Sequence, residues 1–165
     1  IEKQQFVNPD LLLEHFWNVF IVDTLLGNFD RHNGNWGFLY CPSDNHSRIA
    51  PVFDCGSCLL PQANVKVMEK VLCDENEMNS RIYRFPTSAI HLNGKKINYY
   101  DFLCSDTDKD CNKALDRMLK RIDLNKINQF IDRTEYTSDI QKEFYKCYIS
   151  NRYNKILISA YNTIK

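Results

Sequence analysis

The apolar residues of this chain recur mostly at helical intervals. Asn8-Pro9 has the features of a helix start, because Asn can cap a helix and Pro fits its first position. From there to Gly27, large apolar residues recur every three or four positions, with further apolar residues between them. We therefore predict a helix that is buried around most of its circumference and that ends at Gly27.

Helical patterns also dominate the chain from about residue 99 onward, whereas two short regions favour β-hairpins. An aromatic stretch and a second strand candidate flank a turn at 42–45, and Asn93-Gly94 predicts a tight hairpin turn. The expected fold class is therefore mainly α with one or two small β-hairpins. The predicted strands are 36–40 and 48–53, the second hairpin lies within 89–97, and the predicted helices are 65–71, 109–121, 124–132 and 138–164.

Composition and charge narrow the possible partners. The chain has 165 residues, of which 44% are hydrophobic, and its 21 acidic and 21 basic residues cancel. This balance gives no reason to expect nucleic-acid or membrane-surface binding, and the aromatic residues at 36, 38 and 40 are predicted to pack the hairpin rather than to stack on bases. No apolar run is long enough to span a bilayer. We expect a cytoplasmic protein, and we take a chain that begins with Ile1 to be a fragment.

The cysteines are predicted to be reduced, semi-buried thiols. There are seven of them, an odd number, scattered along the chain mostly beside apolar or aromatic residues, which is typical of a reduced cytoplasmic protein. Cys55-x-x-Cys58 has the spacing of a zinc or redox motif, but no second pair with matching spacing accompanies it. Metal or redox chemistry at this pair is therefore disfavoured.

The polar loop after Gly27 carries the candidate chemistry. Asp30 and Asn35 are five positions apart, and Asp54 follows the second predicted strand. Protein kinases use an Asp and an Asn at this spacing, followed by a metal-binding Asp. Paired strands lie about 5 Å apart, so a hairpin would bring Asn35 and Asp54 together at its open end. Asp30 would then accept a proton from the attacking hydroxyl, while Asn35 and Asp54 hold Mg²⁺.

Other residues of this region keep two interpretations each. Arg31 could reach a phosphate or pair with a carboxylate, and Asp23 could bond the loop or face solvent. Asn28 could brace the loop or be a spectator, and His32 fits packing and hydrogen bonding better than proton transfer. Asp and Asn are also common in ordinary turns. The whole pattern of buried helix, Gly stop, polar loop and aromatic hairpin nevertheless favours a functional site.

At these residues the chain resembles the HipA-like kinases, in particular the C-terminal domain of the CtkA-type branch. The family's catalytic loop, N-x-D-x-H-x-x-N, is matched by Asn28, Asp30, His32 and Asn35, and its metal-binding Asp by Asp54. The specific motifs cover about forty residues, and the similarity in the later part of the chain is less diagnostic. The matching stretches are 16–38 and 49–57, with the weaker similarity at 88–100.

The resemblance implies a Ser/Thr kinase of protein-kinase-like fold that uses ATP and Mg²⁺ to phosphorylate a protein substrate. It implies that Asn28, Asp30 and His32 belong to the catalytic loop, with Asp30 as the base, and that Asn35 and Asp54 bind the cofactor and its metal. Such proteins often serve as toxins of bacterial toxin–antitoxin pairs or as secreted effectors, so an antitoxin-type partner is a further expectation. Phosphoinositide kinases share a D-R-H-x-x-N loop, which leaves a lipid kinase as an alternative.

The sequence departs from a complete kinase in one respect. A kinase needs a Gly-rich loop over the phosphates and a strand-borne Lys, and the five glycines here lie far apart. We therefore expect residues 1–165 to be a single C-terminal lobe that lacks its N-terminal lobe and is inactive alone. The alternatives are a non-catalytic protein-interaction module and a metal-dependent phosphohydrolase that uses Asp30, His32 and Asp54. The expected lobe comprises a catalytic loop at 27–36, a metal-Asp hairpin at 36–54 and a helical scaffold at about 99–165.

Overall fold

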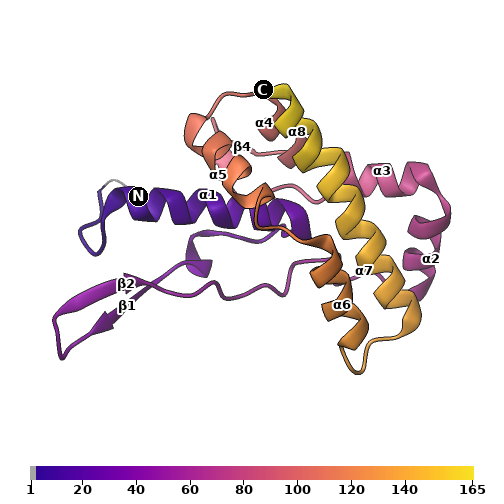
Figure 1. Ribbon diagram of the computed structural model, residues 1–165, viewed down its shortest axis with the longest axis horizontal. Helices are drawn as coiled ribbons and strands as arrows, with labels where there is room; N and C mark the ends of the chain where they lie inside the picture. The colour runs from indigo at the N-terminus through magenta and orange to yellow at the C-terminus, as the bar shows by residue number, and fades with distance from the viewer. Residues whose placement is uncertain (1–2) are drawn as a thin grey trace.

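The computed structural model describes residues 3–165 as a mainly helical molecule with two small β-hairpins (Figure 1). The expected fold class is thus confirmed. The helices are α1 (Pro9–Leu26), α2 (Val65–Cys73), α3 (Glu75–Tyr83), α4 (Tyr99–Cys104), α5 (Lys109–Leu119), α6 (Leu124–Arg133), α7 (Asp139–Arg152) and α8 (Ser159–Thr163). A 3₁₀ turn, η1 (Asn33–Asn35), and a π-helical segment, η2 (Tyr153–Ile158), complete them. The strands are β1 (Phe38–Cys41), β2 (His46–Ile49), β3 (His91–Leu92) and β4 (Lys95–Lys96).

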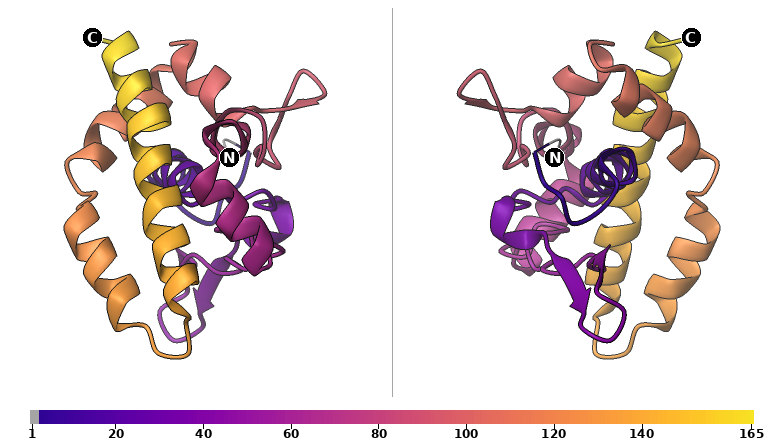
Figure 2. Two further views of the ribbon diagram at one scale, coloured as in Figure 1. Left: turned by 90° about the vertical axis from the view of Figure 1, so that its right-hand side faces the viewer. Right: turned by 90° about the vertical axis from the view of Figure 1, so that its left-hand side faces the viewer.

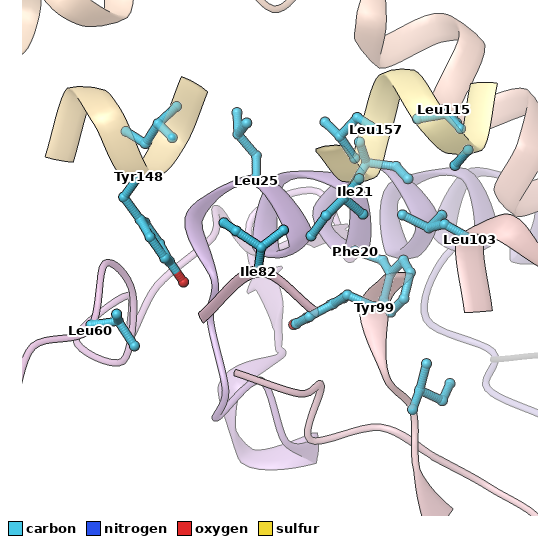
Figure 3. Packing of buried hydrophobic residues seen from close by; sticks show 14 of the residues in the cluster. Phe20, Ile21, Leu25, Leu60, Ile82, Tyr99, Leu103, Leu115, Tyr148 and Leu157 are labelled. Carbon is cyan, nitrogen blue, oxygen red and sulfur yellow. The ribbon is translucent and has the colours of Figure 1, made fainter. Parts of the chain in front are cut away.

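Helix α1 is the central element of the fold. Helices α7, η2 and α8 form one continuous helical rod that crosses it, and α5 packs along it as well (Figures 1 and 2). Phe20, Ile21 and Leu25 of α1 are almost completely buried, and they meet residues of the later helices such as Leu115 and Leu157 (Figure 3). The apolar pattern of the sequence therefore identifies the element around which the core is built.

Both ends of α1 form as the sequence predicts. The Asn8 side chain accepts a hydrogen bond from the backbone N–H of Asp10 at 2.8 Å, and Pro9 occupies the first helical position. Gly27 ends the helix in a left-handed conformation with φ of 67°, a region that favours glycine. The chain leaves α1 at a fixed angle, directly into the polar loop that carries the candidate chemistry.

The first hairpin is shorter and more exposed than the sequence predicts. Strands β1 and β2 pair antiparallel from Phe38 opposite Ile49 to the tip, and the last bond beside them joins the Ala50 N–H to the Gly37 carbonyl. Pro51 cannot donate to a ladder, so the second strand ends before it and does not reach residue 53. The predicted packing of the aromatic run is confirmed for Trp36, which stacks on Phe16, and for Phe38, whose ring lies 5.1 Å from that of Phe6, whereas Tyr40 is 59% exposed.

The second hairpin, β3–β4, confirms its prediction. Asn93 and Gly94 both have positive φ, at 51° and 78°, as a two-residue type I′ turn requires. Lys95 and Lys96 beside the turn are exposed.

Two helical features were not predicted. Helix α3 was not predicted, because its segment shows little apolar periodicity. Met78 and Ile82 are its only buried residues. The predicted helix at 138–164 forms as a continuous rod, but its hydrogen bonding becomes π-helical in η2, directly after the buried Arg152. Within residues 3–165 no helix combines the length and the apolar character needed to cross a membrane.

Candidate functional site

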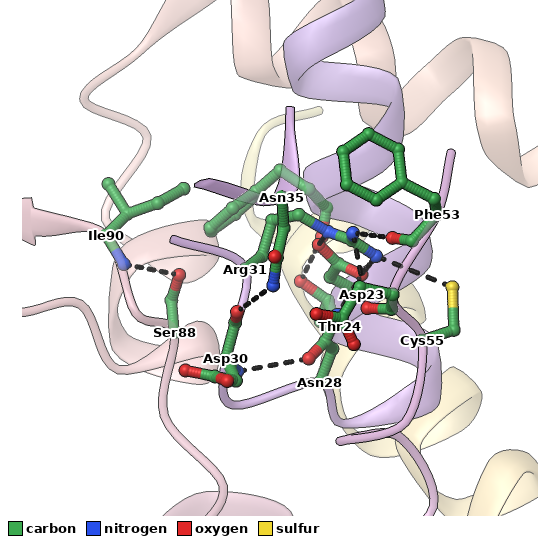
Figure 4. Close-up of polar contacts among 12 residues, drawn as sticks. Asp23, Thr24, Asn28, Asp30, Arg31, Asn35, Phe53, Cys55, Ser88 and Ile90 are labelled. Carbon is green, nitrogen blue, oxygen red and sulfur yellow. Dashed lines mark hydrogen bonds and ion pairs between the residues drawn. The ribbon is translucent and has the colours of Figure 1, made fainter. Parts of the chain in front are cut away.

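Asn28 anchors the loop that follows α1. It is completely buried, and its side-chain amide donates to a carboxylate oxygen of Asp23 at 2.9 Å while its side-chain oxygen accepts the Asp30 N–H at 3.0 Å (Figure 4). Its backbone carbonyl accepts the Tyr99 hydroxyl at 2.5 Å. Asn28 therefore braces the loop, which was one of its two interpretations. Its bond to the Asp30 N–H holds the backbone of Asp30 in place.

Arg31 pairs with a carboxylate, which was one of its two interpretations. Its Nε and Nη2 atoms donate to the two carboxylate oxygens of Asp23 at 3.0 and 3.1 Å, and both side chains are almost fully buried. Its third nitrogen, Nη1, donates to the carbonyl of Phe53 at 2.5 Å (Figure 4). Burial lowers the pKa of Arg31, but the hydrogen bonds and charge of Asp23 outweigh it and raise that pKa, so the guanidinium stays charged.

The short turn η1 presents Asn35 beside Asp30. The Asn35 amide nitrogen donates to the Asp30 carbonyl at 2.8 Å, so the side-chain oxygen is the atom that could bind a metal (Figure 4). His32 caps η1, because its Nδ1 accepts the Gly34 N–H at 3.0 Å. This Nδ1 is thus occupied as an acceptor, which fits the hydrogen-bonding interpretation of His32. The Asp30 side chain is exposed, unlike that of Asn35.

Asp54 lies beyond the end of the paired hairpin. Its side chain is exposed and its φ is 53°, an unusual value for a residue other than glycine. Arg31 links Asp54 to the loop, because its Nη1 lies 3.5 Å from the Asp54 carbonyl. The two parts of the predicted site are therefore joined through Arg31. That Asn35 and Asp54 bind one ion together stays a prediction.

The donor set fits magnesium held with a nucleotide better than a metal held by protein alone. In residues 3–165 no group of three or more His, Cys, Asp or Glu side chains could hold a metal ion. Asn35 and Asp54 would instead supply one amide oxygen and one carboxylate. Mg²⁺ characteristically uses one or two carboxylates together with waters and substrate phosphates.

An apolar cavity of about 270 Å³ lies next to Asn35, between α1 and the first hairpin. Arg31 and Asn35 give it a polar edge, and most of its remaining lining is apolar or aromatic. Small-molecule sites commonly combine apolar walls with a few polar groups in this way. The apolar and aromatic lining residues are Leu12, Phe16, Val19, Trp36, Phe38, Ile49, Ala50, Pro51, Val52 and Phe53.

Two residues that brace this region lie far from it in the sequence, so no local sequence pattern indicates their contacts. Tyr99 reaches Asn28 from 71 positions away, and the fully buried Arg152 donates to the Thr24 carbonyl in the last turn of α1. All seven cysteines are free, and the predicted partial burial is wrong for Cys41, Cys55 and Cys73, which are exposed. Cys55 lies within 3.6 Å of Arg31, and burial together with the charge of Asp23 raises the pKa of Cys58 to about 12.

Comparison with known proteins gives a clear relationship. No protein-family model matches the chain. It is 52% identical over 162 residues to the serine/threonine-protein kinase CtkA of Helicobacter pylori, a match that covers 98% of this chain and 50% of that protein. The crystal structure of a Helicobacter pylori proinflammatory kinase CtkA matches with a TM-score of 0.96 and 51% identity, over 99% of this chain and 60% of the crystallised one.

This chain therefore spans about half the length of the curated relative that it matches. Its relationship to that kinase is close, because both sequence and backbone agree over almost the whole chain. The resemblance to the CtkA-type branch predicted from the loop motif is thus confirmed, and the chain has the kinase-like fold of the corresponding part of CtkA.

Proposed function

We propose that this chain is the catalytic-loop lobe of a Ser/Thr protein kinase that transfers the γ-phosphate of ATP to a protein hydroxyl. The observation that carries the proposal is the braced loop from Asn28 to Asn35, in a chain 52% identical to a Ser/Thr kinase. In phosphoryl transfer the protein contributes mainly positioning and charge stabilisation. A loop that is bonded at Asn28, His32 and Asn35 is suited to that task.

Asp30 is the proposed base. Its backbone N–H is bonded to Asn28 and its carbonyl to Asn35, while its carboxylate is exposed toward any incoming substrate. As the acceptor hydroxyl oxygen bonds to the γ-phosphorus and the bond to ADP breaks, the hydroxyl proton would pass to the Asp30 carboxylate. The roles of His32 and Asn28 follow from their contacts: they would hold the loop in shape around Asp30.

Asn35 and Asp54 are the proposed ligands of Mg²⁺ with the nucleotide. The bound ion would neutralise charge on the phosphates during transfer. The apolar cavity next to Asn35 would accept the adenine base, because its walls are aromatic and aliphatic.

A second lobe would complete the proposed enzyme. The curated relative is about twice as long as this chain, and apolar side chains are exposed around the cavity. Leu39, Val52 and Phe53 are each more than 40% exposed, as are Phe6 and Leu11 nearby along the chain. We propose that the lobe carrying the phosphate-binding loop covers this surface, and that the chain alone is inactive.

The test is phosphate transfer by the full-length protein, measured with radiolabelled ATP and casein as a general substrate. Asp30→Asn should lower kcat by about 10²–10⁴-fold, and Asp54→Asn should abolish metal-dependent transfer. Asp44→Asn is the matched control, since Asp44 lies in the exposed turn of the same hairpin. It should leave the rate unchanged. Full activity of the Asp30 variant would contradict the assignment, and absence of any ATP turnover would leave a non-catalytic interaction module.

A further inference from the structure

Arg31 connects two segments whose relative position matters for the proposed site. We infer that Arg31 is a positioning residue that sets the place of Asp54 relative to the catalytic loop. The inference rests on the proposed function only for the metal-binding role of Asp54. The connection itself follows from the contacts of the guanidinium group.

The segment 51–54 has little else to hold it. Strand β2 ends at Ile49, and Pro51 has no N–H to donate. Among the hydrogen bonds within residues 3–165, Arg31 supplies the only ones that this segment takes part in, at the Phe53 and Asp54 carbonyls. Val52, Phe53 and Asp54 are also exposed, so burial does not fix them. Arg31 is thus the tether of this segment.

The guanidinium is fixed at its other end. Asp23 accepts two parallel bonds from Nε and Nη2, which sets both the distance and the plane of the group. Asp23 itself lies in the last turns of α1 and also holds Asn28. One rigid group therefore relates the α1 end, the catalytic loop and the segment that carries Asp54.

A lysine cannot reproduce this geometry. Its single ammonium has the charge of Arg31 but no planar fork, so it cannot hold both Asp23 oxygens and the Phe53 carbonyl. Arg31→Lys should therefore release segment 51–54 while keeping a cation beside the buried Asp23. Replacing a group that orients a metal ligand in this way typically lowers the metal affinity by about 10–100-fold.

The experiment combines two measurements on the purified chain. Backbone ¹⁵N relaxation gives order parameters for the Phe53, Asp54 and Cys55 amides, and electron paramagnetic resonance gives the affinity for the Mn²⁺–ATP complex, with Mn²⁺ as the probe ion. Arg31→Lys should lower the order parameters from about 0.85 to below about 0.6, and should weaken Mn²⁺ binding about tenfold or more. Arg152→Lys is the matched control, because Arg152 is equally buried but contacts carbonyls of α1 and α3 instead.

The possible results separate the two proposals. Unchanged order parameters in Arg31→Lys, or an equal loss in Arg152→Lys, would overturn the tether. If Asp54→Asn, introduced without the Arg31 substitution, does not alter Mn²⁺ binding, the proposed metal role of Asp54 fails. The order parameters would still decide whether Arg31 is the tether. Should Arg31→Lys fail to fold, the double variant Asp23→Asn with Arg31→Met removes the buried charges together, and it should show the same loss of order.

Discussion

The entry into the polar loop after α1 depends on a single glycine, Gly27, and replacing it tests the packing of this corner. A Cβ atom at Gly27 would collide with the Tyr148 hydroxyl and would lie 2.9 Å from Cγ of Pro86. The Tyr148 side chain has little room to move, because it is fully buried, stacks on Phe144 and contacts Arg152 through its hydroxyl. Gly27→Ala should therefore destabilise the fold through both conformation and collision.

The magnitude follows from these two contributions. A left-handed conformation costs a residue other than glycine about 1–2 kcal/mol, and Gly27 has φ of 67°. Overpacking a well-filled site adds about 1–3 kcal/mol. The sum is a loss of about 2–5 kcal/mol in the free energy of unfolding. Gly94→Ala is the matched control, since Gly94 has φ of 78° but nothing within 4 Å of its added Cβ. It should lose only the first contribution.

Urea unfolding followed by circular dichroism at 222 nm would measure both variants. Gly27→Ala should lower the free energy of unfolding by about 1–3 kcal/mol more than Gly94→Ala does. Adding Tyr148→Phe to Gly27→Ala should recover part of that difference, because it removes the atom that meets the new Cβ most closely. Equal losses in the two alanine variants would refute the packing argument.

Four further predictions concern the rest of the molecule. Iodoacetamide at pH 8 should label the exposed Cys55 well before Cys58, whose pKa of about 12 keeps it protonated, and mass spectrometry would give the order. Thermal or urea unfolding should show a loss of about 3–5 kcal/mol for Phe144→Ala, and a change within about 0.5 kcal/mol for Phe130→Ala, which removes a largely exposed ring. Burial raises the pKa of Tyr99 in the folded protein. The contribution of Tyr99 to the free energy of unfolding should therefore be complete below the pKa of about 10 that tyrosine has in the unfolded chain, and it should fall as the pH rises above that value. Urea unfolding measured between pH 8 and 11 would show this fall. The purified chain alone should transfer no phosphate, and autophosphorylation would contradict that expectation.

Local patterns predicted the helices and the second hairpin well, because their signals lie in adjacent residues. The cap at Asn8, the stop at Gly27 and the turn at Asn93 each depend on the conformation of a few neighbouring positions. Helix α3 was missed because its stability comes from two buried side chains and a cap by Asp74, and not from a long apolar stripe. The exposure of β1 was missed because aromatic content indicates a strand but not what covers it.

The spacing of the candidate site was readable in the sequence, but its supports were not. Asp30 and Asn35 stand at a recognisable interval, and the structure adds a direct bond between them. The tie from Tyr99 to Asn28 joins residues that only the tertiary fold brings together. Asp23 is the partner of Arg31 because both side chains are buried. The apolar periodicity of α1 did not show whether Asp23 would be buried or exposed. Sequence therefore predicts candidate reacting groups, whereas the groups that position them become visible only in the tertiary structure.

The two sides of the candidate site are supported in different ways. The loop is held by a buried polar network around Asp23, and such a network is stable only when its members are bonded to one another. Strands β1 and β2 instead expose apolar side chains, Leu39 and Tyr40 among them, and the bonds from Arg31 reach only the segment after these strands. We therefore expect the loop to keep its geometry in the isolated chain. The hairpin is the part whose order should change when another surface covers it.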